Sequence, residues 1–456
     1  MTNVVRVIGG GLAGAEAAYQ LARRGVAVEL FEMRPVRETE AHATGDFGEL
    51  VCSNSLRSNL LTAPAGLLKE EMRRLGSLVI RVAEANRVPA GAALAVDRGG
   101  FARALSTAVE ALPMVNVIRR EVTEIPSGVA ILATGPLTSP ALSSVLSAML
   151  GEEHLYFYDA ISPIVTAESI DMALAYRAAR YGQGDGDYLN LPLSKAEYYR
   201  FVAALRGAVR VPTHSFERFV TFEGCMPIEE MADRGDETLA FGPMRAVGLV
   251  DPRTGTRSYA VVQLRQENRE GTLYNLVGFQ TKMTYSEQRR VFALIPGLEN
   301  AEFVRLGSLH RNTFINAPAH LEPTLQWRRR STLFFAGQVT GVEGYIESAA
   351  TGLLAGINGA RLLAGQAPVV PPPTTALGAL LRYVTDPERM KFQPMNVNFG
   401  LLPPLAERLR GKAKKEMMSL RALAAMDAWL KETAQAAANL DFADTDPTQY
   451  KVTTAP

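Results

Sequence analysis

Cysteine is scarce in this sequence, and its scarcity limits the kinds of reaction that the protein is expected to catalyse. Only Cys52 and Cys225 occur among 456 residues, and no Cys-x-x-C motif exists. An interpretation as a dithiol oxidoreductase therefore loses its main support. The histidines also show no spacing typical of metal ligands, so we predict no metal site. They are His42, His154, His214, His310 and His320.

Long apolar runs and an excess of charge are also missing. No run reaches the length of a bilayer span, no signal peptide precedes the first predicted strand, and the formal net charge is only +1. We therefore expect a cytoplasmic protein with no membrane association, on which any nucleic-acid surface is a local patch. The 47% hydrophobic content is ample for a buried core, and the length suggests two domains or one domain with an insertion.

The N-terminal stretch contains a dinucleotide-binding fingerprint in its full context. Residues 4–8 form an apolar, β-branched run, a helical stretch covers residues 15–24, and residues 26–32 form a second apolar run that ends in Glu32. The turn between the first run and the helix consists of Gly9, Gly10, Gly11, Leu12, Ala13 and Gly14.

Each residue type in this fingerprint has a physical reason. Gly9 permits a tight turn, Gly11 lets the backbone approach a pyrophosphate, and Gly14 lets the helix pack close to the sheet. The pyrophosphate would lie at the positive end of the helix, where backbone N–H groups lack partners. The carboxylate of Glu32 can then bond a ribose hydroxyl. A dinucleotide site is therefore predicted here.

Two further buried strands predict how the chain returns to this sheet. Residues 129–135 and 333–338 each end in a glycine turn, and a small-residue helix over 348–363 follows the second. Between them, residues 156–309 are rich in aromatic and β-branched segments mixed with short helices. The predicted fold is α/β, a glutathione-reductase-like Rossmann FAD-binding domain with an inserted α+β domain.

The predicted boundaries follow from this pattern. Residues 1–150 and 311–456 form the FAD-binding domain, residues 151–310 form the insertion, and residues 77–97 could visit the insertion domain. We also expect strands at 122–125 and 219–222 and a basic helix over 405–420. No second glycine fingerprint with a predicted strand before it and a predicted helix after it occurs, so we predict no dedicated NAD(P) domain.

Three motifs besides the fingerprint support a resemblance. Residues 47–55 read FGELVCSNS, residues 223–229 read EGCMPIE, and residues 335–345 read FAGQVTGVEGY. In this order, and over nearly the whole chain, they resemble the bacterial folate- and flavin-dependent tRNA (uracil-5-)-methyltransferases. The two cysteine motifs are the specific part. The glycine motifs alone fit many flavoproteins, including a sister family that modifies the tRNA wobble uridine.

The resemblance implies a reaction and its participants. The chain would methylate carbon 5 of the T-loop uridine at position 54 of tRNA. Methylenetetrahydrofolate would donate the carbon, reduced FAD would be the reductant, and NADH or NADPH would reduce the flavin. Cys225 would attack carbon 6 of uracil, because a thiolate is a strong nucleophile that can later be expelled. Cys52 would be a second thiol beside the flavin, as a base or an aid to release.

The resemblance also places weaker candidates. Gly135, Gly337, Gln338 and Gly341 would line the flavin by analogy of position, and the ring of His310 would stack on the folate. A small-molecule flavin oxidoreductase and a flavin-containing RNA-binding factor with idle thiols remain alternatives. No obligate protein partner is evident.

Two basic segments are candidates for contact with tRNA. One is residues 408–421, in which basic residues outnumber acidic ones, and the other is Trp327 with the three arginines that follow it. A solvated helix face is an equally good interpretation of the first. The basic residues of the first segment are Arg408, Arg410, Lys412, Lys414, Lys415 and Arg421.

Overall fold

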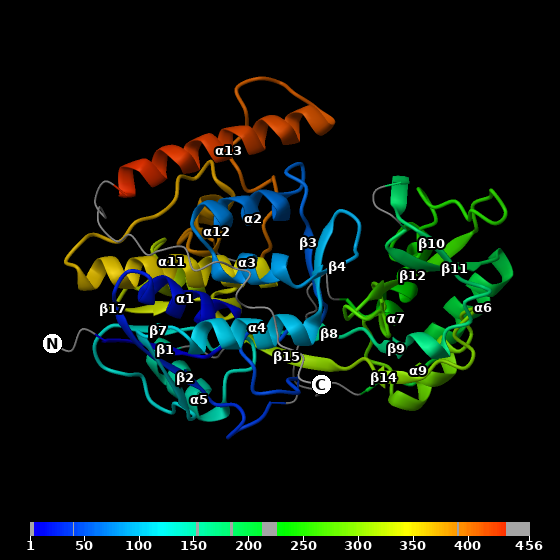
Figure 1. Ribbon diagram of the computed structural model, residues 1–456, viewed down its shortest axis with the longest axis horizontal. Helices are drawn as coiled ribbons and strands as arrows, with labels where there is room; N and C mark the ends of the chain where they lie inside the picture. The colour runs from blue at the N-terminus through cyan, green and yellow to red at the C-terminus, as the bar shows by residue number, and fades with distance from the viewer. Residues whose placement is uncertain are drawn as a thin grey trace.

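A computed structural model describes residues 4–39, 41–151, 155–182, 186–211, 226–389 and 392–434; for residues 155–159, 309–311 and 434 it describes only the backbone. Two six-stranded sheets lie along the long axis of the molecule (Figure 1). The first is formed by the two ends of the chain and the second by its middle. The chain therefore leaves the first sheet, builds the second, and returns.

The first sheet is parallel apart from one edge strand. Its central strand β7 is buried on both faces and β1 and β2 beside it are mostly buried, as their apolar runs predict, whereas the edge strands are partly exposed. Their spatial order is β16 (Gln326–Trp327), β17 (Arg330–Phe335), β7 (Ala130–Leu132), β1 (Val4–Ile8), β2 (Ala27–Glu32) and β6 (Val115–Arg119), with β16 antiparallel to β17. All its parallel strands end at the same edge, where a ligand site is expected.

Two helices cross closely beside this sheet. They are α1 (Leu12–Ala22) and α11 (Tyr345–Leu363). A Cβ added to Gly352 would lie 2.1 Å from the backbone oxygen of Ala13, and one added to Gly356 would lie 2.7 Å from that of Ala17. Small residues on α11 therefore let the two helix backbones approach within contact distance.

The remaining helices of this part surround the sheet, and α13 runs across one side of it (Figure 1). The buried carboxylate of Glu71 accepts hydrogen bonds from the backbone N–H groups of Ala376 (2.7 Å) and Leu377 (2.9 Å), so α2 caps α12. These helices are α2 (Pro64–Arg74), α3 (Leu78–Ala85), α4 (Arg98–Glu110), α5 (Pro140–Leu150), α10 (Ala317–His320), α12 (Ala376–Val384) and α13 (Gly411–Ala434), with a 3-10 turn η4 (Gln338–Thr340).

The second sheet is antiparallel and has its own core of aromatic and aliphatic side chains. Its order is β10 (Tyr176–Ala178), β11 (Tyr188–Leu193), β12 (Ala260–Gln266), β13 (Leu273–Leu276), β9 (Ile164–Thr166) and β14 (Phe303–Arg305). Helices α6 (Lys195–Arg206), α7 (Ile228–Asp233), α8 (Thr238–Phe241) and α9 (Tyr285–Phe292) belong to the same stretch, with 3-10 turns η1 (Ala167–Ser169) and η2 (Arg180–Gly182).

Two small sheets lie outside the two large ones. One pairs β8 (Leu155–Ala160) with β15 (Leu309–Phe314), and the other contains β3 (Ser55–Ser58), β5 (Ala93–Val96) and β4 (Arg87–Val88). The loop between β4 and β5 contacts the second sheet, since the hydroxyl of Tyr188 donates to the backbone oxygen of Ala90 at 3.1 Å. The boundaries at residues 150 and 310 stay a prediction.

Two predicted elements are wrong. Residues 122–125 form no strand, because Val122 and Ile125 turn their side chains onto the apolar cluster around α5 instead of pairing with the sheet. The basic helix begins at Gly411 and ends at Ala434, not at residues 405 and 420, since residues 405–410 are mostly exposed and have no apolar face to pack as a helix. The predicted strand at 219–222 lies outside the described residues.

Candidate functional site

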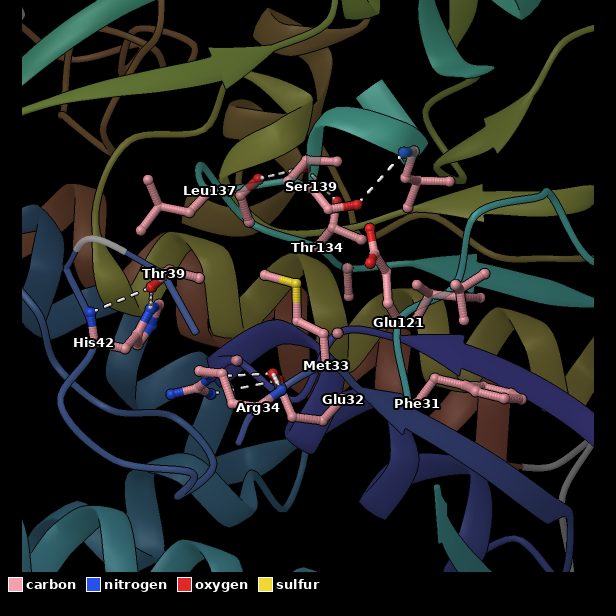
Figure 2. Close-up of a pocket in the computed structure, with 18 of the residues that line it drawn as sticks. Phe31, Glu32, Met33, Arg34, Thr39, His42, Glu121, Thr134, Leu137 and Ser139 are labelled. Carbon is pink, nitrogen blue, oxygen red and sulfur yellow. Dashed lines mark hydrogen bonds and ion pairs between the residues drawn. The ribbon is translucent and has the colours of Figure 1, made fainter. Parts of the chain in front are cut away.

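The first cavity lies where the parallel strands of the first sheet end. It is lined by Gly9 and Gly11 of the turn, by residues 31–34 at the end of β2, by residues 120–122 after β6, and by residues 133–139 after β7 (Figure 2). Thr39 and His42 close one side, and the Thr39 hydroxyl lies 2.6 Å from Nδ1 of His42. This is the place where the fingerprint predicts a dinucleotide.

The glycine turn fits that ligand. A Cβ on Gly9 would lie 2.4 Å from the backbone oxygen of Ala133, and one on Gly14 would lie 1.7 Å from that of Gly9, so neither position tolerates a side chain. No described atom comes within 4 Å of a Cβ built on Gly11, which precedes α1 and has no side chain to cap it. The backbone N–H groups at the start of α1 therefore face space that a pyrophosphate can enter.

Glu32 is held as a carboxylate at this cavity. Its Oε2 accepts the Gly10 N–H at 2.8 Å, and its Oε1 accepts the backbone N–H and the Nε of Arg34 at 2.9 and 3.0 Å. Burial opposes ionisation of Glu32, but the bonds and charge of Arg34 outweigh it and lower its pKa. A fixed carboxylate at the end of β2 is what a ribose hydroxyl requires, so the residues here fit FAD.

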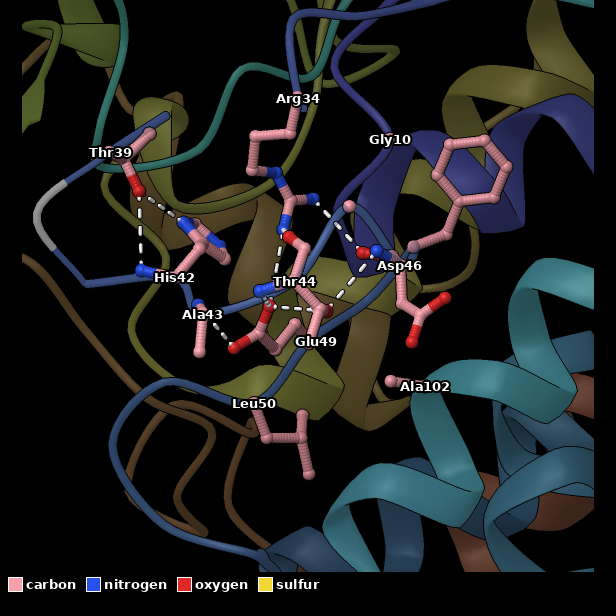
Figure 3. Close-up of polar contacts among 12 residues, drawn as sticks. Gly10, Arg34, Thr39, His42, Ala43, Thr44, Asp46, Glu49, Leu50 and Ala102 are labelled. Carbon is pink, nitrogen blue, oxygen red and sulfur yellow. Dashed lines mark hydrogen bonds and ion pairs between the residues drawn. The ribbon is translucent and has the colours of Figure 1, made fainter. Parts of the chain in front are cut away.

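A second carboxylate organises the loop that follows. Glu49 accepts the backbone N–H groups of Ala43 (2.8 Å) and Thr44 (3.0 Å) and the Thr44 hydroxyl (2.8 Å), and Arg34 reaches it at 3.4 Å (Figure 3). Arg34 thus links the glycine turn, through Glu32, to the loop that leads to Cys52.

Glu32→Gln is expected to weaken FAD binding about 10- to 100-fold, because a hydrogen bond to a charged group contributes about 1.5–3 kcal/mol. Titration of the apoprotein with FAD, followed by flavin fluorescence, measures this change. The matched control is Glu29→Gln on the same strand, whose half-exposed carboxylate pairs with Arg6 instead. Equal affinity for FAD in the wild-type and Glu32→Gln proteins would show that Glu32 holds the turn and not the cofactor.

The second cavity joins the two large sheets. Its wall combines residues 51–53 and 55–57, residues 343–346 at the start of α11, and residues from the middle of the chain, including Ile161, Arg265 and Gln280. Pro136 and Leu137 line both cavities, so the second begins where the first ends. A ligand that spans both would have its nucleotide end on the first sheet and its other end between the sheets.

Cys52 lies in this second cavity, on a backbone that Tyr345 holds. The phenol oxygen of Tyr345 accepts the N–H of Cys52 at 2.8 Å and the N–H of Ser53 at 3.2 Å. Burial, together with the neighbouring Cys52, raises the pKa of Tyr345, so this group stays a neutral phenol. The Cys52 Sγ lies 3.9 Å from the backbone oxygen of Ala160, at the end of β8.

The predicted site residues separate into five groups. Gly9, Gly11, Glu32 and Gly135 line the first cavity, and Cys52 and Gln338 line the second. Gly10, Leu12, Ala13 and Gly14 shape the turn and the start of α1 behind the first cavity. Gly337 and Gly341 adopt positive φ angles of 81° and pack against Ala13 and Phe392, away from the described lining. Cys225 and the side chain of His310 lie outside the described residues.

Several polar residues of the site were not predicted from the sequence. Arg34 follows Glu32 by two positions, and Arg265 and Asn275 interrupt apolar strands, which is the signal that could have found them. Arg57 forms an ion pair with the buried Glu347 beside the second cavity.

The two basic segments differ in their freedom to bind RNA. Arg328 and Arg330 donate to backbone oxygens, those of Leu321 and Pro126 among them, and the indole N–H of Trp327 is buried. The side chains before and along the first turns of α13 are exposed, with 81% of the Lys412 side chain accessible. The segment around α13 is therefore the better surface for a phosphate backbone.

Neither a metal-binding group nor a membrane span is found in the part of the chain that the structure describes. No group of three or more His, Cys, Asp or Glu residues is placed there to hold a metal ion. Within the same ranges, no helix combines the length and the apolar composition that a bilayer crossing needs.

Comparison with known structures shows the fold. Two crystal forms of Aquifex aeolicus GidA superpose with TM-scores of 0.66 and 0.68 at 17% identity, covering 94% and 93% of this chain and 76% and 75% of those chains. The predicted α/β architecture, a Rossmann-type FAD-binding fold carrying an insertion, is thereby confirmed.

Comparison with known sequences shows the family. The family described as Glucose inhibited division protein A matches residues 4–367. A protein of Geobacter sulfurreducens named methylenetetrahydrofolate–tRNA-(uracil-5-)-methyltransferase TrmFO is 60% identical, over 94% of this chain and 99% of its own length. A protein of Desulforudis audaxviator with the same name is 59% identical, over 95% of this chain and 100% of its own length. The chain belongs to the glucose inhibited division protein A family and, within it, to the group whose members are named methylenetetrahydrofolate–tRNA-(uracil-5-)-methyltransferase.

Proposed function

We propose that this protein methylates carbon 5 of a uridine in tRNA, at position 54 of the T loop, with methylenetetrahydrofolate as the carbon donor. The observation that carries the proposal is the position of Cys52. Its thiol lies in a cavity that continues from the dinucleotide cradle and is closed by the second sheet. A thiol, a flavin and a third ligand can therefore meet there.

The chemistry of uracil explains why thiols are needed. Carbon 5 is a poor nucleophile until a thiolate adds to carbon 6, after which carbon 5 behaves as an enolate and can attack an activated methylene. Cys225 is the residue we assign to carbon 6, and Cys52 is the second thiol, which takes the carbon-5 proton or aids release. Bound FAD, when reduced, supplies the hydride that converts the methylene on carbon 5 to a methyl group.

The reductant of the flavin is NADH or NADPH in this proposal. A single dinucleotide fingerprint occurs in the chain, so the nicotinamide donor would visit the flavin cavity without a domain of its own. The ring of His310 would stack on the folate, as the family resemblance implies.

The RNA partner is supported by the basic surface around α13. Exposed lysines there are free of the tight ion pairs that hold Arg34 or Arg98, and Lys412 only approaches Glu416 at 3.5 Å. A uridine inside a folded T loop must be extruded to reach the second cavity, at a cost of a few kcal/mol.

The names and lengths of the relatives favour this proposal. The chain covers 99–100% of the two relatives named for uracil-5 methylation, but only 75–76% of the GidA chains. The 5-methyluridine reaction is therefore the better candidate.

An isotope experiment tests the function. Purified holoprotein is mixed with an unmodified tRNA transcript, methylenetetrahydrofolate labelled in its one-carbon unit, and NADH or NADPH, and the digested nucleosides are weighed. We expect labelled 5-methyluridine at the T loop. If the nicotinamide is oxidised but no label enters the RNA, the protein is instead a flavin oxidoreductase that acts on another substrate.

Tyr345→Phe is expected to lower the methylation rate about tenfold or more while FAD content is retained. Removal of the phenol oxygen leaves two backbone N–H groups without their acceptor, and each unsatisfied buried donor costs about 1–3 kcal/mol, which loosens the Cys52 backbone. Initial rates of label transfer measure the effect. Tyr383→Phe is the control, since its hydroxyl only donates to the backbone oxygen of Gln393 at 3.2 Å on the surface. Equal losses in both variants would contradict the role of Tyr345.

A further inference from the structure

Two buried polar side chains of the second sheet face the cavity that contains Cys52. Arg265 on β12 and Asn275 on β13 are directly opposite each other in the antiparallel register. Their exposed fractions are 7% and 2%, and both line the second cavity. They lie on the face of the sheet opposite its aromatic and aliphatic core, to which the alternate residues Leu264, Tyr274 and Leu276 belong.

Arg265 is bonded only to neutral oxygens. Its Nε donates to Oδ1 of Asn54 at 2.8 Å, and its Nη2 donates to Oγ of Ser53 at 2.7 Å and to Oδ1 of Asn275 at 3.4 Å. Among the described residues, no carboxylate forms an ion pair with it, whereas the nearby Arg98 pairs with Glu267. A buried cation without a counter-charge is costly, and a ligand that brings negative charge would reduce that cost.

Asn275 has an unused donor at the same place. Its Oδ1 accepts from Arg265, but its Nδ2 has no hydrogen-bond partner among the described residues, although the side chain is almost completely buried. A buried amide N–H₂ without a partner is rare in folded proteins, and it points to a ligand oxygen. The guanidinium and the amide together form a pair of donors beside the Cys52 loop.

We propose that Arg265 and Asn275 bind the ring carbonyl of the target uracil that is conjugated to carbon 6. This inference rests on the proposed function and adds two catalytic residues to it. When the thiolate adds, the S–C6 bond forms, and the C5–C6 π pair moves toward carbon 5 and the carbonyl oxygen, which becomes an enolate oxygen. The two donors stabilise this charge. Attack of carbon 5 on the methylene uses this electron pair and returns the oxygen to a neutral carbonyl. Loss of the carbon-5 proton then forms the enolate again, and its collapse expels the folate amine and leaves an exocyclic methylene. Hydride transfer to that methylene re-forms the C5–C6 double bond and expels the thiolate.

The position of Arg265 and Asn275 favours the uracil base as their ligand over a phosphate or a carboxylate. A tRNA phosphate or a carboxylate at the end of the folate needs an exposed cation, and Arg265 is buried. Arg265 also bonds Ser53, the neighbour of Cys52 in the chain, so its donors are fixed relative to a thiol. Fixed donors in a dry site stabilise developing charge most strongly.

Asn275→Asp is the decisive variant, because it has the same shape. The aspartate still accepts from Arg265, so the contact between the strands is kept, but it has no N–H to donate and it neutralises the guanidinium. Arg265→Lys is the second variant, which keeps the positive charge and removes the planar, bidentate arrangement of the guanidinium donors. Arg177→Gln is the control, an exposed arginine on β10 of the same sheet that donates to Tyr274 at 3.2 Å.

We expect the kcat of label transfer to fall about 100-fold in Asn275→Asp and in Arg265→Lys, the loss typical when one oxyanion donor is removed. FAD content, Tm and the KM for methylenetetrahydrofolate stay unchanged, and the control keeps its kcat. A kcat within threefold of wild type in the folded variants overturns the inference alone. A raised KM for folate with unchanged kcat also overturns it and assigns the pair to the pterin. If the wild-type protein transfers no label to the RNA, the proposed function and this inference are both overturned.

Discussion

Replacing Cys225 by alanine is expected to abolish formation of 5-methyluridine, with a fall in rate of at least about 1,000-fold. Without a nucleophile at carbon 6, carbon 5 never becomes enolate-like, and neither the folate nor the flavin can compensate. FAD content and tRNA affinity should be unaffected, because Cys225 lies in the sequence outside both the glycine fingerprint and the basic segment around α13. The measurement is label transfer to tRNA at saturating cofactors.

The matched control is Cys52→Ala, which removes the other thiol of the chain. A transcript that contains 5-fluorouridine, which cannot lose a carbon-5 proton, is expected to form a covalent adduct with Cys52→Ala and none with Cys225→Ala in the presence of methylenetetrahydrofolate. The reverse pattern would exchange the roles of the two thiols. Full methylation by both variants would support an RNA-binding factor in which the thiols are idle.

Gly14→Ala is expected to prevent stable folding of the FAD-binding part, whereas Gly11→Ala is expected to leave the fold intact and remove the cofactor. The added Cβ at residue 14 would meet the backbone oxygen of Gly9 at 1.7 Å, and no flexible side chain is available to give way. The Cβ at residue 11 would enter the open space before α1, which the pyrophosphate needs.

Thermal unfolding and FAD titration of the two variants separate these effects. For Gly14→Ala we expect a loss of several kcal/mol in stability, seen as insoluble protein or a Tm at least about 10 °C lower. For Gly11→Ala we expect an apoprotein Tm close to wild type and FAD affinity lower by about 100-fold or more. A Gly11→Ala protein that keeps its yellow colour through purification would contradict the placement of the pyrophosphate.

The first sheet could be predicted because its signals are local. The run of β-branched residues at 4–8, the glycine turn and Glu32 lie within one stretch of chain, and the structure places them at one cavity. The strand expected at 122–125 failed because an apolar alternation does not distinguish a paired strand from a segment that packs its side chains on a helix. The basic helix was predicted too early in the chain because its charges defined it, whereas the side chains that pack it on the core, Met418, Met426 and Trp429 among them, lie further along.

The second cavity could be predicted only in part. Cys52 was found from its motif, but Arg265 and Asn275 come from strands more than 200 positions later, and only the tertiary fold places them next to Ser53. The spacing of residues along the chain does not indicate that these side chains lie close together in the fold. The roles of Cys225 and His310 rest on resemblance alone, because neither side chain is among those described.

The close crossing of α1 and α11 has a consequence for how the protein is made. The partner of α1 begins at Tyr345, about 330 residues after Leu12. At roughly 5–20 residues per second, a ribosome needs about 20–70 s to reach it after α1 has been synthesised. During that time the first strand and helix lack the surface on which they pack. FAD can be enclosed only when most of the chain has emerged, so the nascent N-terminus must be shielded from aggregation until α11 arrives.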